Sequence, residues 1–244
     1  MRIVTVISNY NEQGAIEATI RDFRENATIV SDLIVIDNCS TDASLELVKK
    51  AGVNYLRHPV NTGGSAGVIK TALLYADMFG YDVYCHMDGD NQHNAAELAK
   101  LVQPIAAGEA DIVIGSRFIK REGFQSLPVR RVGIFIFSRL VSALTGQKIT
   151  DLTSGFRAYN KRAIHFFARK FKHEFEACVQ MLMVAAYAGL RIREVPVIMN
   201  PRLTGRSEFN LVNSIKFPIF GLVSIAGTML QRNTIKALSH ADQC

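Results

Sequence analysis

Two carboxylates separated by a single glycine are the residues of this chain whose types and spacing most directly suggest chemistry. Asp88-Gly89-Asp90 follows a largely apolar run at residues 83–87 that is typical of a buried strand. Two like charges at the end of such a strand are costly unless a cation neutralises them, although exposed Asp pairs also occur in ordinary turns. Carboxylate oxygens suit Mg²⁺ or Mn²⁺, and these ions usually bind substrate phosphates as well. The pair therefore predicts a site for a divalent cation and a phosphorylated ligand.

Polar or small residues also follow the other strand-like runs, where a ligand could bind. Asp37 could accept hydrogen bonds from a base or a ribose, whereas residues 40–42 are ordinary helix-start residues that capping alone would explain. The run of small residues at 61–67 either allows a ligand to approach closely or forms a tight turn. Arg117 could bind a phosphate through its planar guanidinium group, or it could be a plain surface arginine.

The segment after the first strand-like run argues against two classes of nucleotide enzyme. An NAD-dependent Rossmann enzyme needs a Gly-x-Gly-x-x-Gly turn there, so that a pyrophosphate can reach a helix N-terminus. Residues 9–12 read Asn-Tyr-Asn-Glu, and of the three glycines only Gly14 is present. A sugar-nucleotide-forming nucleotidyltransferase would carry a Gly-rich basic loop at the same place, and this segment does not supply one.

These residues need a fold that brings the ends of several strands together, and the first half of the chain predicts one. Short runs rich in Val and Ile alternate with helical stretches, which is typical of an α/β sandwich with a mostly parallel sheet. In such sheets ligands bind beyond the carboxyl ends of the strands. We expect strands at residues 3–7, 33–36, 53–56, 83–87 and 112–114, and helices at 12–25, 42–51, 66–78 and 95–106.

The second half of the chain is less regular. We expect helices at 132–144, 161–169, 176–188 and 209–230, strands at 156–160 and 191–197, and a basic loop at 202–207. Because no internal repeat or linker is visible, we expect one domain over residues 1–210. Residues 211–244 would form a C-terminal apolar helix and tail.

The charge of the chain is divided unevenly along its length. Its 244 residues carry a formal charge of +6, with 28 Lys and Arg against 22 Asp and Glu. Residues 1–117 hold nine basic and fifteen acidic side chains, whereas residues 118–244 hold nineteen and seven. The basic half suggests an anionic partner, and the acidic half could bind a phosphate through a cation. A nucleic acid is not expected, because the basic loop at 202–206 lacks the interleaved aromatic residues of such sites.

Two apolar segments predict contact with a membrane surface. Residues 133–144 and 217–230 have basic flanks and are shorter than the ~18 apolar residues of a spanning helix. Such helices lie in the membrane interface more readily than they cross it. Alternatively, both helices belong to the core or to an oligomer interface. The four cysteines are scattered and residues 3–7 are too few for a signal-peptide core, so we expect a cytoplasmic protein, peripheral at the inner face of the membrane.

Six short motifs occur in order between residues 3 and 210. They are Asn9 to Glu12, Asp37 to Asp42, Asp88 to His93, Gly115 to Arg117, Asp151 to Arg157, and Arg202 with Gly205 and Ser207. Together they resemble the motifs of family 2 glycosyltransferases, and more narrowly those of the branch of polyprenol- and dolichol-phosphate mannose synthases. The resemblance implies a GT-A fold, which is a Rossmann-like α/β/α sandwich, and a hexosyltransferase that uses a nucleotide-diphosphate sugar.

The resemblance also implies roles for individual residues. The divalent cation, Mg²⁺ or Mn²⁺, would be bound by Asp88, Asp90 and Gln92. The catalytic residues would be Asp88, Asp90 and Asp151. The nucleotide sugar would contact Asn9, Asn11, Glu12, Asp37, Asn38, Ser40, Asn61, Gly63, Asp88, Gly89, Asp90, Arg202, Arg206 and Ser207. The acceptor or its phosphate would contact Arg117, Arg131 and Ser154.

The implied reaction displaces a nucleoside diphosphate from a sugar carbon with inversion, while the cation stabilises the leaving diphosphate. A polyprenyl phosphate acceptor is already anionic and needs no base, and the basic side chains of Arg117, Arg130 and Arg131 favour it. A sugar hydroxyl of a lipid-linked or surface polysaccharide would need a carboxylate base, for which the candidates are Asp151, Glu174 and Glu176. Residues 61–64 are similar to family branches that transfer to sugar hydroxyls, so both acceptors stay open, as does a homo-oligomer.

Overall fold

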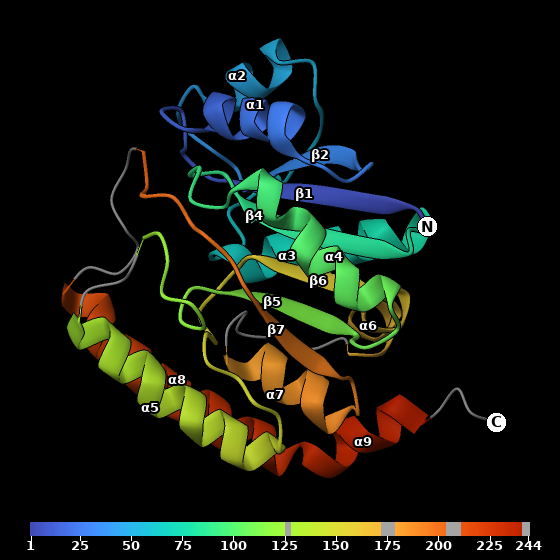
Figure 1. The fold of residues 1–244 in the computed structure, drawn as a ribbon, viewed down its shortest axis with the longest axis vertical. Helices are drawn as coiled ribbons and strands as arrows, with labels where there is room; N and C mark the ends of the chain where they lie inside the picture. Colours follow the sequence, from blue (N-terminus) through green and yellow to red (C-terminus); the bar gives the residue numbers. More distant parts are fainter. Residues whose placement is uncertain (125–127, 172–178, 204–210, 241–244) are drawn as a thin grey trace.

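A mixed β-sheet runs through the centre of the molecule (Figure 1). The computed structural model describes residues 1–124, 128–171, 179–203 and 211–240, and for residues 128–130, 211–220 and 240 it describes the backbone alone. Within these residues seven strands lie in the order β3-β2-β1-β4-β6-β5-β7, and β6 is antiparallel to both neighbours. The bounds are Ile3–Asn9 (β1), Asp32–Asp37 (β2), Asn54–Arg57 (β3), Val83–Asp88 (β4), Ile112–Ser116 (β5), Arg157–Asn160 (β6) and Ile192–Pro196 (β7). The predicted, mostly parallel sheet is confirmed.

Helices cover both faces of this sheet, which confirms the predicted α/β/α sandwich. One face packs against α1 (Ile16–Asn26), α2 (Ser44–Lys50), the short η1 (Ala95–Glu97) and α4 (Leu98–Ala106). The other packs against α3 (Ser65–Met78), α6 (Lys161–His165), the π-helix η2 (Phe166–Lys170) and α7 (Val179–Tyr187). The alternation of side chains along β1 explains the two layers, because Val4 and Val6 face one core cluster and Ile3 and Ile7 the other.

Some elements begin or end away from their predicted limits for local reasons. The first helix starts at Ile16 instead of residue 12, because the Glu12 carbonyl accepts the N–H groups of Ala15 and Ile16 in a turn. The predicted helix at 161–169 ends at His165 and continues as the π-helix. β3 is an exposed edge strand and not a buried one.

Two long helices, α5 (Pro128–Thr145) and α8 (Leu211–Leu230), lie side by side and form a two-helix arm below the sheet in Figure 1. Both helices begin on the left of the view. β1 starts at the N-terminus on the right and runs toward that same side. α8 also packs on α7, and its Ile225 joins the core cluster on the α3 face. The last helix is α9 (Arg232–His240). Across the described ranges, no helix combines the length and apolar character needed to cross a bilayer.

Candidate active site

The carboxyl ends of β1, β2 and β4 bring residues from three predicted motifs to one edge of the sheet. The strand register places Asn9 beside Asp37 and Ser8 beside Asp88. Ligands bind at such an edge in open α/β sheets, because helix starts and loop residues of neighbouring strands converge there. Sequence motifs 28 and 51 residues apart therefore form one polar cluster, as the bond from Asn9 to Asp37 already shows.

Hydrogen-bond donors surround the partly exposed carboxylate of Asp88. The Ser8 hydroxyl donates to Oδ1 at 3.1 Å, and His93 Nε2 lies 3.5 Å from Oδ2. Burial acts to raise the pKa of Asp88, but the contacts with His93, His86 and Ser8 outweigh it and hold the pKa below its usual range. Burial lowers the pKa of His93 to about 4, so His93 is a neutral imidazole near neutral pH. Asp88 is therefore ionised.

Asp90 lies in the opposite electrostatic situation. Its Oδ1 accepts the backbone N–H of Gln92 at 3.0 Å, and its Oδ2 lies 3.7 Å from Arg202 Nε. Burial and the negative charge of Asp88 raise the pKa of Asp90 to about 6. The charge of Asp88 thus adds to the effect of burial on Asp90, and a shared cation would relieve this repulsion.

The donor set at this turn fits a hard divalent cation. Asp88 and Asp90 supply carboxylate oxygens, which Mg²⁺ and Mn²⁺ prefer. Among the residues that the structure describes, no group of three or more His, Cys, Asp or Glu side chains is arranged to hold a metal ion. A cation held by two carboxylates takes its remaining ligands from water and substrate phosphates, as Mg²⁺ commonly does. The arrangement is therefore suited to binding metal and diphosphate together.

Two glycines make room for this turn. A Cβ atom on Gly89 would lie 2.7 Å from the backbone oxygen of Ser8, so any side chain would displace the segment that joins the two carboxylates. A Cβ atom on Gly155 would lie 3.1 Å from Asp88 Oδ2. The loop before β6 therefore passes directly beside the Asp88 carboxylate.

Glu12 and Arg202 close the other side of the cluster. The Arg202 guanidinium forms an ion pair with the Glu12 carboxylate as well as approaching Asp90. Burial raises the pKa of Glu12 to about 7, with further contributions from Asp90 and Asp88, while Arg202 opposes the shift. The carboxylates of Glu12 and Asp90 thus share one guanidinium, and a bound cation would change this balance of charge.

Asp37 organises the loops at the neighbouring strand ends. Its carboxylate has no exposed surface and accepts hydrogen bonds from Asn9 Nδ2 at 2.7 Å and the Ser40 N–H at 3.1 Å. The Ser40 hydroxyl in turn accepts the backbone N–H of Asn11 at 3.0 Å. Asp37 is therefore buried and shapes the loop after β2, whereas Asn11 is exposed to solvent.

Asn38 positions the segment that contains Asn61 and Gly63. Its Oδ1 accepts hydrogen bonds from the backbone N–H and the hydroxyl of Thr62, at 3.0 and 2.8 Å. His58 Nδ1 lies 2.9 Å from the same oxygen. Asn61 and Gly63 are exposed at this edge of the sheet, where the backbone φ of Gly63 is 77°. The side-chain amide of Asn38 therefore holds the loop at residues 61–63 in place.

A comparison with known families decides what kind of protein carries this site. The model of glycosyl transferase family 2 matches residues 5–167, which is more than half of the chain. The chain belongs to glycosyl transferase family 2. The predicted family is confirmed, and with it a glycosyltransferase that depends on a nucleotide sugar.

Relatives within family 2 confirm the resemblance to enzymes of polyprenol-phosphate sugars. The undecaprenyl-phosphate mannosyltransferase of Micrococcus luteus is 31% identical, over 86% of this chain and 88% of that protein. The UDP-N-acetylglucosamine–dolichyl-phosphate N-acetylglucosaminyltransferase of Methanococcus voltae is 27% identical, over 80% and 84%. The crystal structure of glucosyl-3-phosphoglycerate synthase from Mycobacterium tuberculosis with phosphoglyceric acid superposes with a TM-score of 0.69, covering 93% of this chain and 79% of that one at 18% identity. At that identity the likeness shows the fold alone, which is the predicted GT-A fold.

Arg117 and Asp151, two motif residues of this family 2 protein, bind each other. Arg117 Nε and Nη2 donate to the two Asp151 oxygens at 2.8 and 2.7 Å, and the Arg117 backbone N–H adds a third bond at 3.1 Å. The Asp151 side chain has no exposed surface. This geometry suits a residue that positions the 151–155 loop and does not suit a general base. Ser154 is also buried, and its hydroxyl accepts the Phe156 N–H at 3.3 Å.

The remaining predicted site residues lie apart from this cluster or outside the described structure. Arg131 is exposed in the first turn of α5. Glu174, Glu176, Arg206 and Ser207 lie outside the described residues, as does the side chain of Arg130.

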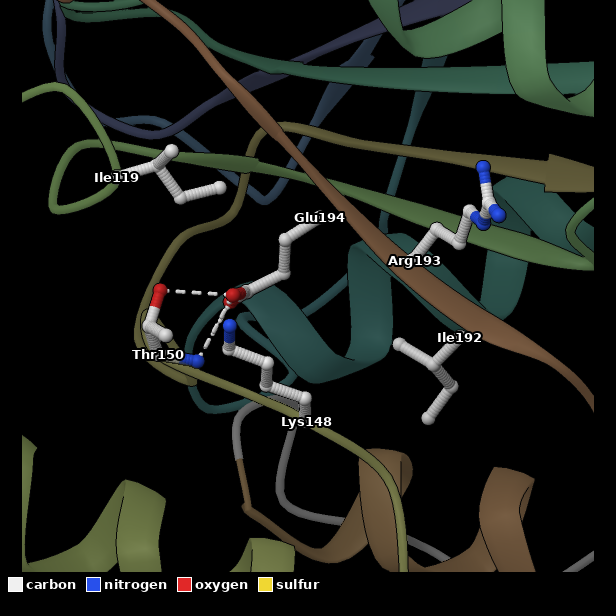
Figure 2. Close-up of a pocket in the computed structure, with 6 residues that line it drawn as sticks. All are labelled: Ile119, Lys148, Thr150, Ile192, Arg193 and Glu194. Atoms are coloured by element: carbon white, nitrogen blue, oxygen red, sulfur yellow. Dashed lines mark hydrogen bonds between the residues drawn. The ribbon is translucent and has the colours of Figure 1, made fainter.

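A cavity of about 460 Å³ lies beside β7 and contains none of the predicted site residues (Figure 2). It is lined by Ile119, Lys148, Thr150, Ile192, Arg193 and Glu194. The Glu194 carboxylate accepts hydrogen bonds from the backbone N–H and hydroxyl of Thr150 and from the Asp151 N–H. Glu194 and Arg117 therefore both hold the loop at Asp151, Glu194 through the Asp151 backbone N–H and Arg117 through the Asp151 side chain.

Sequence reasoning missed the buried side chains that support the site. His86 lies 3.3 Å from Asp88 Oδ1, and Arg157 donates from Nε and Nη2 to the carbonyls of Ser154 and Leu152. The signal for His86 was present, because a residue two positions before Asp88 on a strand shares its face. Arg157 gave no such signal, since its partners come from a loop whose path the sequence does not reveal.

Proposed function

We propose that this protein is an inverting, divalent-cation-dependent glycosyltransferase that transfers a sugar from a nucleoside-diphosphate sugar to a polyprenyl phosphate. The observation that carries the proposal is the pair of carboxylates, Asp88 and Asp90, which the close-packed Gly89 joins at the carboxyl end of β4. The names of the relatives from Micrococcus luteus and Methanococcus voltae support the acceptor. Glucosyl-3-phosphoglycerate synthase crystallised with Mn²⁺ and UDP supports the cation.

The residues of the cluster have complementary tasks in this proposal. Asp88 and Asp90, with Gln92, would hold the cation, which when bound stabilises negative charge on the departing diphosphate. Arg202 now neutralises Glu12 and Asp90. If Asp88 and Asp90 held a cation, the charge of Asp90 would be compensated, and the Arg202 guanidinium could then bind a phosphate oxygen of the donor. The loop held by Asn38 and Asp37 would border the nucleoside.

The buried pair of Arg117 and Asp151 favours a phosphate acceptor over a sugar hydroxyl. A hydroxyl nucleophile needs a base with a free lone pair within reach. Both oxygens of Asp151 accept hydrogen bonds from the Arg117 guanidinium, and deprotonating an acceptor would require that pair to break. A polyprenyl phosphate is already an anion and attacks without a base. The arrangement therefore matches the acceptor that the relatives use.

The two-helix arm is where the lipid chain and the membrane would meet the protein. Val132, Phe135 and Ile136 on α5 and Leu222 and Val223 on α8 are each more than half exposed. Neighbouring exposed face positions on α5 are basic, at residues 131 and 139. Apolar faces with basic residues bind the interface of anionic membranes. Because both helices begin on the side toward which the parallel strands run, the arm would present the lipid phosphate to the site.

The test is transfer from UDP-, GDP- and dTDP-sugars to polyprenyl phosphate with Mn²⁺ or Mg²⁺. We expect a lipid-phosphate sugar whose anomeric configuration is inverted relative to the donor, as read by NMR of the anomeric proton. Asp88→Asn should abolish transfer, whereas Asp22→Asn, a matched change on α1 outside the cluster, should not. Full activity in excess EDTA would refute the cation. Transfer to lipid-linked sugar hydroxyls but never to the lipid phosphate would refute the acceptor.

A further inference from the structure

One face of β4 carries a column of polar side chains that leads from the core to the metal-binding turn. Tyr84, His86 and Asp88 alternate along the strand and therefore point to the same side of the sheet. Tyr84 is 0% and His86 1% exposed, so neither can contact a substrate. In the antiparallel register Tyr159 lies opposite Tyr84, and their rings stack with centroids 5.2 Å apart. The column is thus rigidly packed below the site.

His86 links the tyrosine to the carboxylate through its two ring nitrogens. Nδ1 lies 2.6 Å from the Tyr84 hydroxyl oxygen, and Nε2 lies 3.3 Å from Asp88 Oδ1. Among the described residues no atom satisfies Nε2 in full hydrogen-bond geometry, although it is buried. Because the Asp88 carboxylate lies this close, the protonation of Nε2 bears directly on Asp88.

The tyrosine decides which nitrogen carries the proton. A neutral imidazole has one donor and one acceptor nitrogen, and its tautomer follows from the bond that the other nitrogen makes. Burial raises the pKa of Tyr84 well above its usual value, so the hydroxyl keeps its proton and can donate to Nδ1. When the hydroxyl donates this bond, the proton of His86 sits on Nε2, where it faces the carboxylate. The opposite tautomer would turn a lone pair toward an anion.

A second imidazole acts in the same way on the other oxygen. The backbone N–H of Asp88 donates to His93 Nδ1 at 2.9 Å, which places the proton of His93 on Nε2, 3.5 Å from Asp88 Oδ2. The His93 ring stacks on Phe156 with centroids 4.7 Å apart. Asp88 therefore has one imidazole Nε2 near each oxygen, at 3.3 and 3.5 Å, in addition to the Ser8 hydroxyl that donates to Oδ1 at 3.1 Å.

We propose that Tyr84 and His86 are positioning residues that fix the carboxylate of Asp88 in the orientation required for the cation and its diphosphate. The inference rests on the proposed function, because it concerns the same cation. Groups that hydrogen-bond to a metal-ligating side chain change metal affinity or activity by about 10–100-fold when they are removed. The loss of one hydroxyl on Tyr84, which never approaches the ligand, is expected to act at the lower end of that range.

The experiment compares Tyr84→Phe with Tyr159→Phe in the full-length protein. Each variant deletes one buried hydroxyl from the same stacked ring pair, but the Tyr159 hydroxyl donates to Met181 Sδ, whereas the Tyr84 hydroxyl lies against His86 Nδ1. Binding of Mn²⁺ alone is followed by the loss of the EPR signal of the free ion. Histidine tautomers are read from long-range ¹H–¹⁵N NMR correlations, with His86→Gln to assign the resonance.

We expect wild-type His86 to carry its proton on Nε2, Tyr84→Phe to raise the Kd for Mn²⁺ about tenfold, and Tyr159→Phe to change it less than twofold. A wild-type His86 protonated on Nδ1 would overturn the inference. Equal Mn²⁺ affinity in wild type and Tyr84→Phe would also overturn it while leaving the proposed function intact. A wild-type protein that binds no Mn²⁺ would overturn the proposed cation site itself, and the inference with it.

Discussion

Replacing Asp90 by asparagine should stabilise the free protein while destroying its cation site. The pKa of Asp90 stands at about 6 in the folded protein against an ordinary value of 3.8, because the carboxyl is buried beside the charge of Asp88. The folded state therefore holds this proton more tightly than the unfolded chain does. The associated stability is complete below pH 3.8 and is lost as the pH rises through 6, at a cost of about 3 kcal/mol. Asparagine has the same shape and no charge, so it avoids that cost.

The assay is urea and thermal unfolding of wild type and Asp90→Asn in EDTA at pH 4, 6 and 8. At pH 8 we expect a gain of up to about 3 kcal/mol, or roughly 6–12 °C in Tm for a chain of this size. At pH 4 the gain should nearly vanish, because the wild-type carboxyl is then protonated when folded. Saturating Mn²⁺ should reverse the order at pH 8, since ligand binding stabilises only the protein that binds it.

Asp111→Asn is the matched control, because the pKa of Asp111 is shifted in the opposite direction to that of Asp90. Burial acts to raise the pKa of Asp111, but hydrogen bonds from Arg191 and Asn160 and the charge of Arg191 outweigh it and lower the pKa. The same substitution there should destabilise the protein at pH 8. The reasoning is refuted if Asp90→Asn is no more stable than wild type at pH 8 in EDTA, or if its gain is as large at pH 4.

Two further substitutions test the turn and the arm. Gly89→Ala should weaken Mn²⁺ binding at least tenfold, because its Cβ would lie 2.7 Å from a backbone oxygen. Gly133→Ala, with nothing within 4 Å of its Cβ, should leave Mn²⁺ binding unchanged. Equal Mn²⁺ affinity in the two variants would contradict the close approach at Gly89. Joint replacement of Phe135 and Val223 by glutamate should reduce flotation with anionic liposomes about tenfold, while Val30→Glu, at a side chain that is 95% exposed, should not. Unchanged flotation with a loss of oligomers would assign the arm to contacts between copies.

The fold was predictable from sequence because strands that are buried on both faces of a sheet appear as short, mostly apolar runs. The runs that became β1, β4 and β5 consist mostly of apolar residues, with Thr5 and His86 as exceptions, and each strand is buried along most of its length. Prediction was weaker at β3, whose residues are mostly exposed at the sheet edge. It was also weaker after His165, where a π-helix replaces the expected α-helix and no sequence signal marks the change.

The candidate site divides in the same way. Asp88, Gly89 and Asp90 were recognisable by themselves, because their charge pattern at a strand end is informative without knowledge of any partner. The role of Asp151 was not recognisable from sequence, since it depends on whether a basic side chain lies against the carboxylate. The structure places the Arg117 guanidinium there, 34 residues away in sequence, and this pairing argues against Asp151 among the three candidates for the base that a sugar-hydroxyl acceptor would need.

The sequence by itself determined the family, the strand ends where ligands bind, and the carboxylates suited to a cation. These features are local, being set by side-chain periodicity and by charges that adjoin one another in the chain. Only the tertiary structure decided which charges are neutralised, which are buried, and which nitrogen of His86 faces Asp88. Those properties depend on distances between residues from different strands and loops, and electrostatic energies in a buried site change by several kcal/mol over a few ångströms.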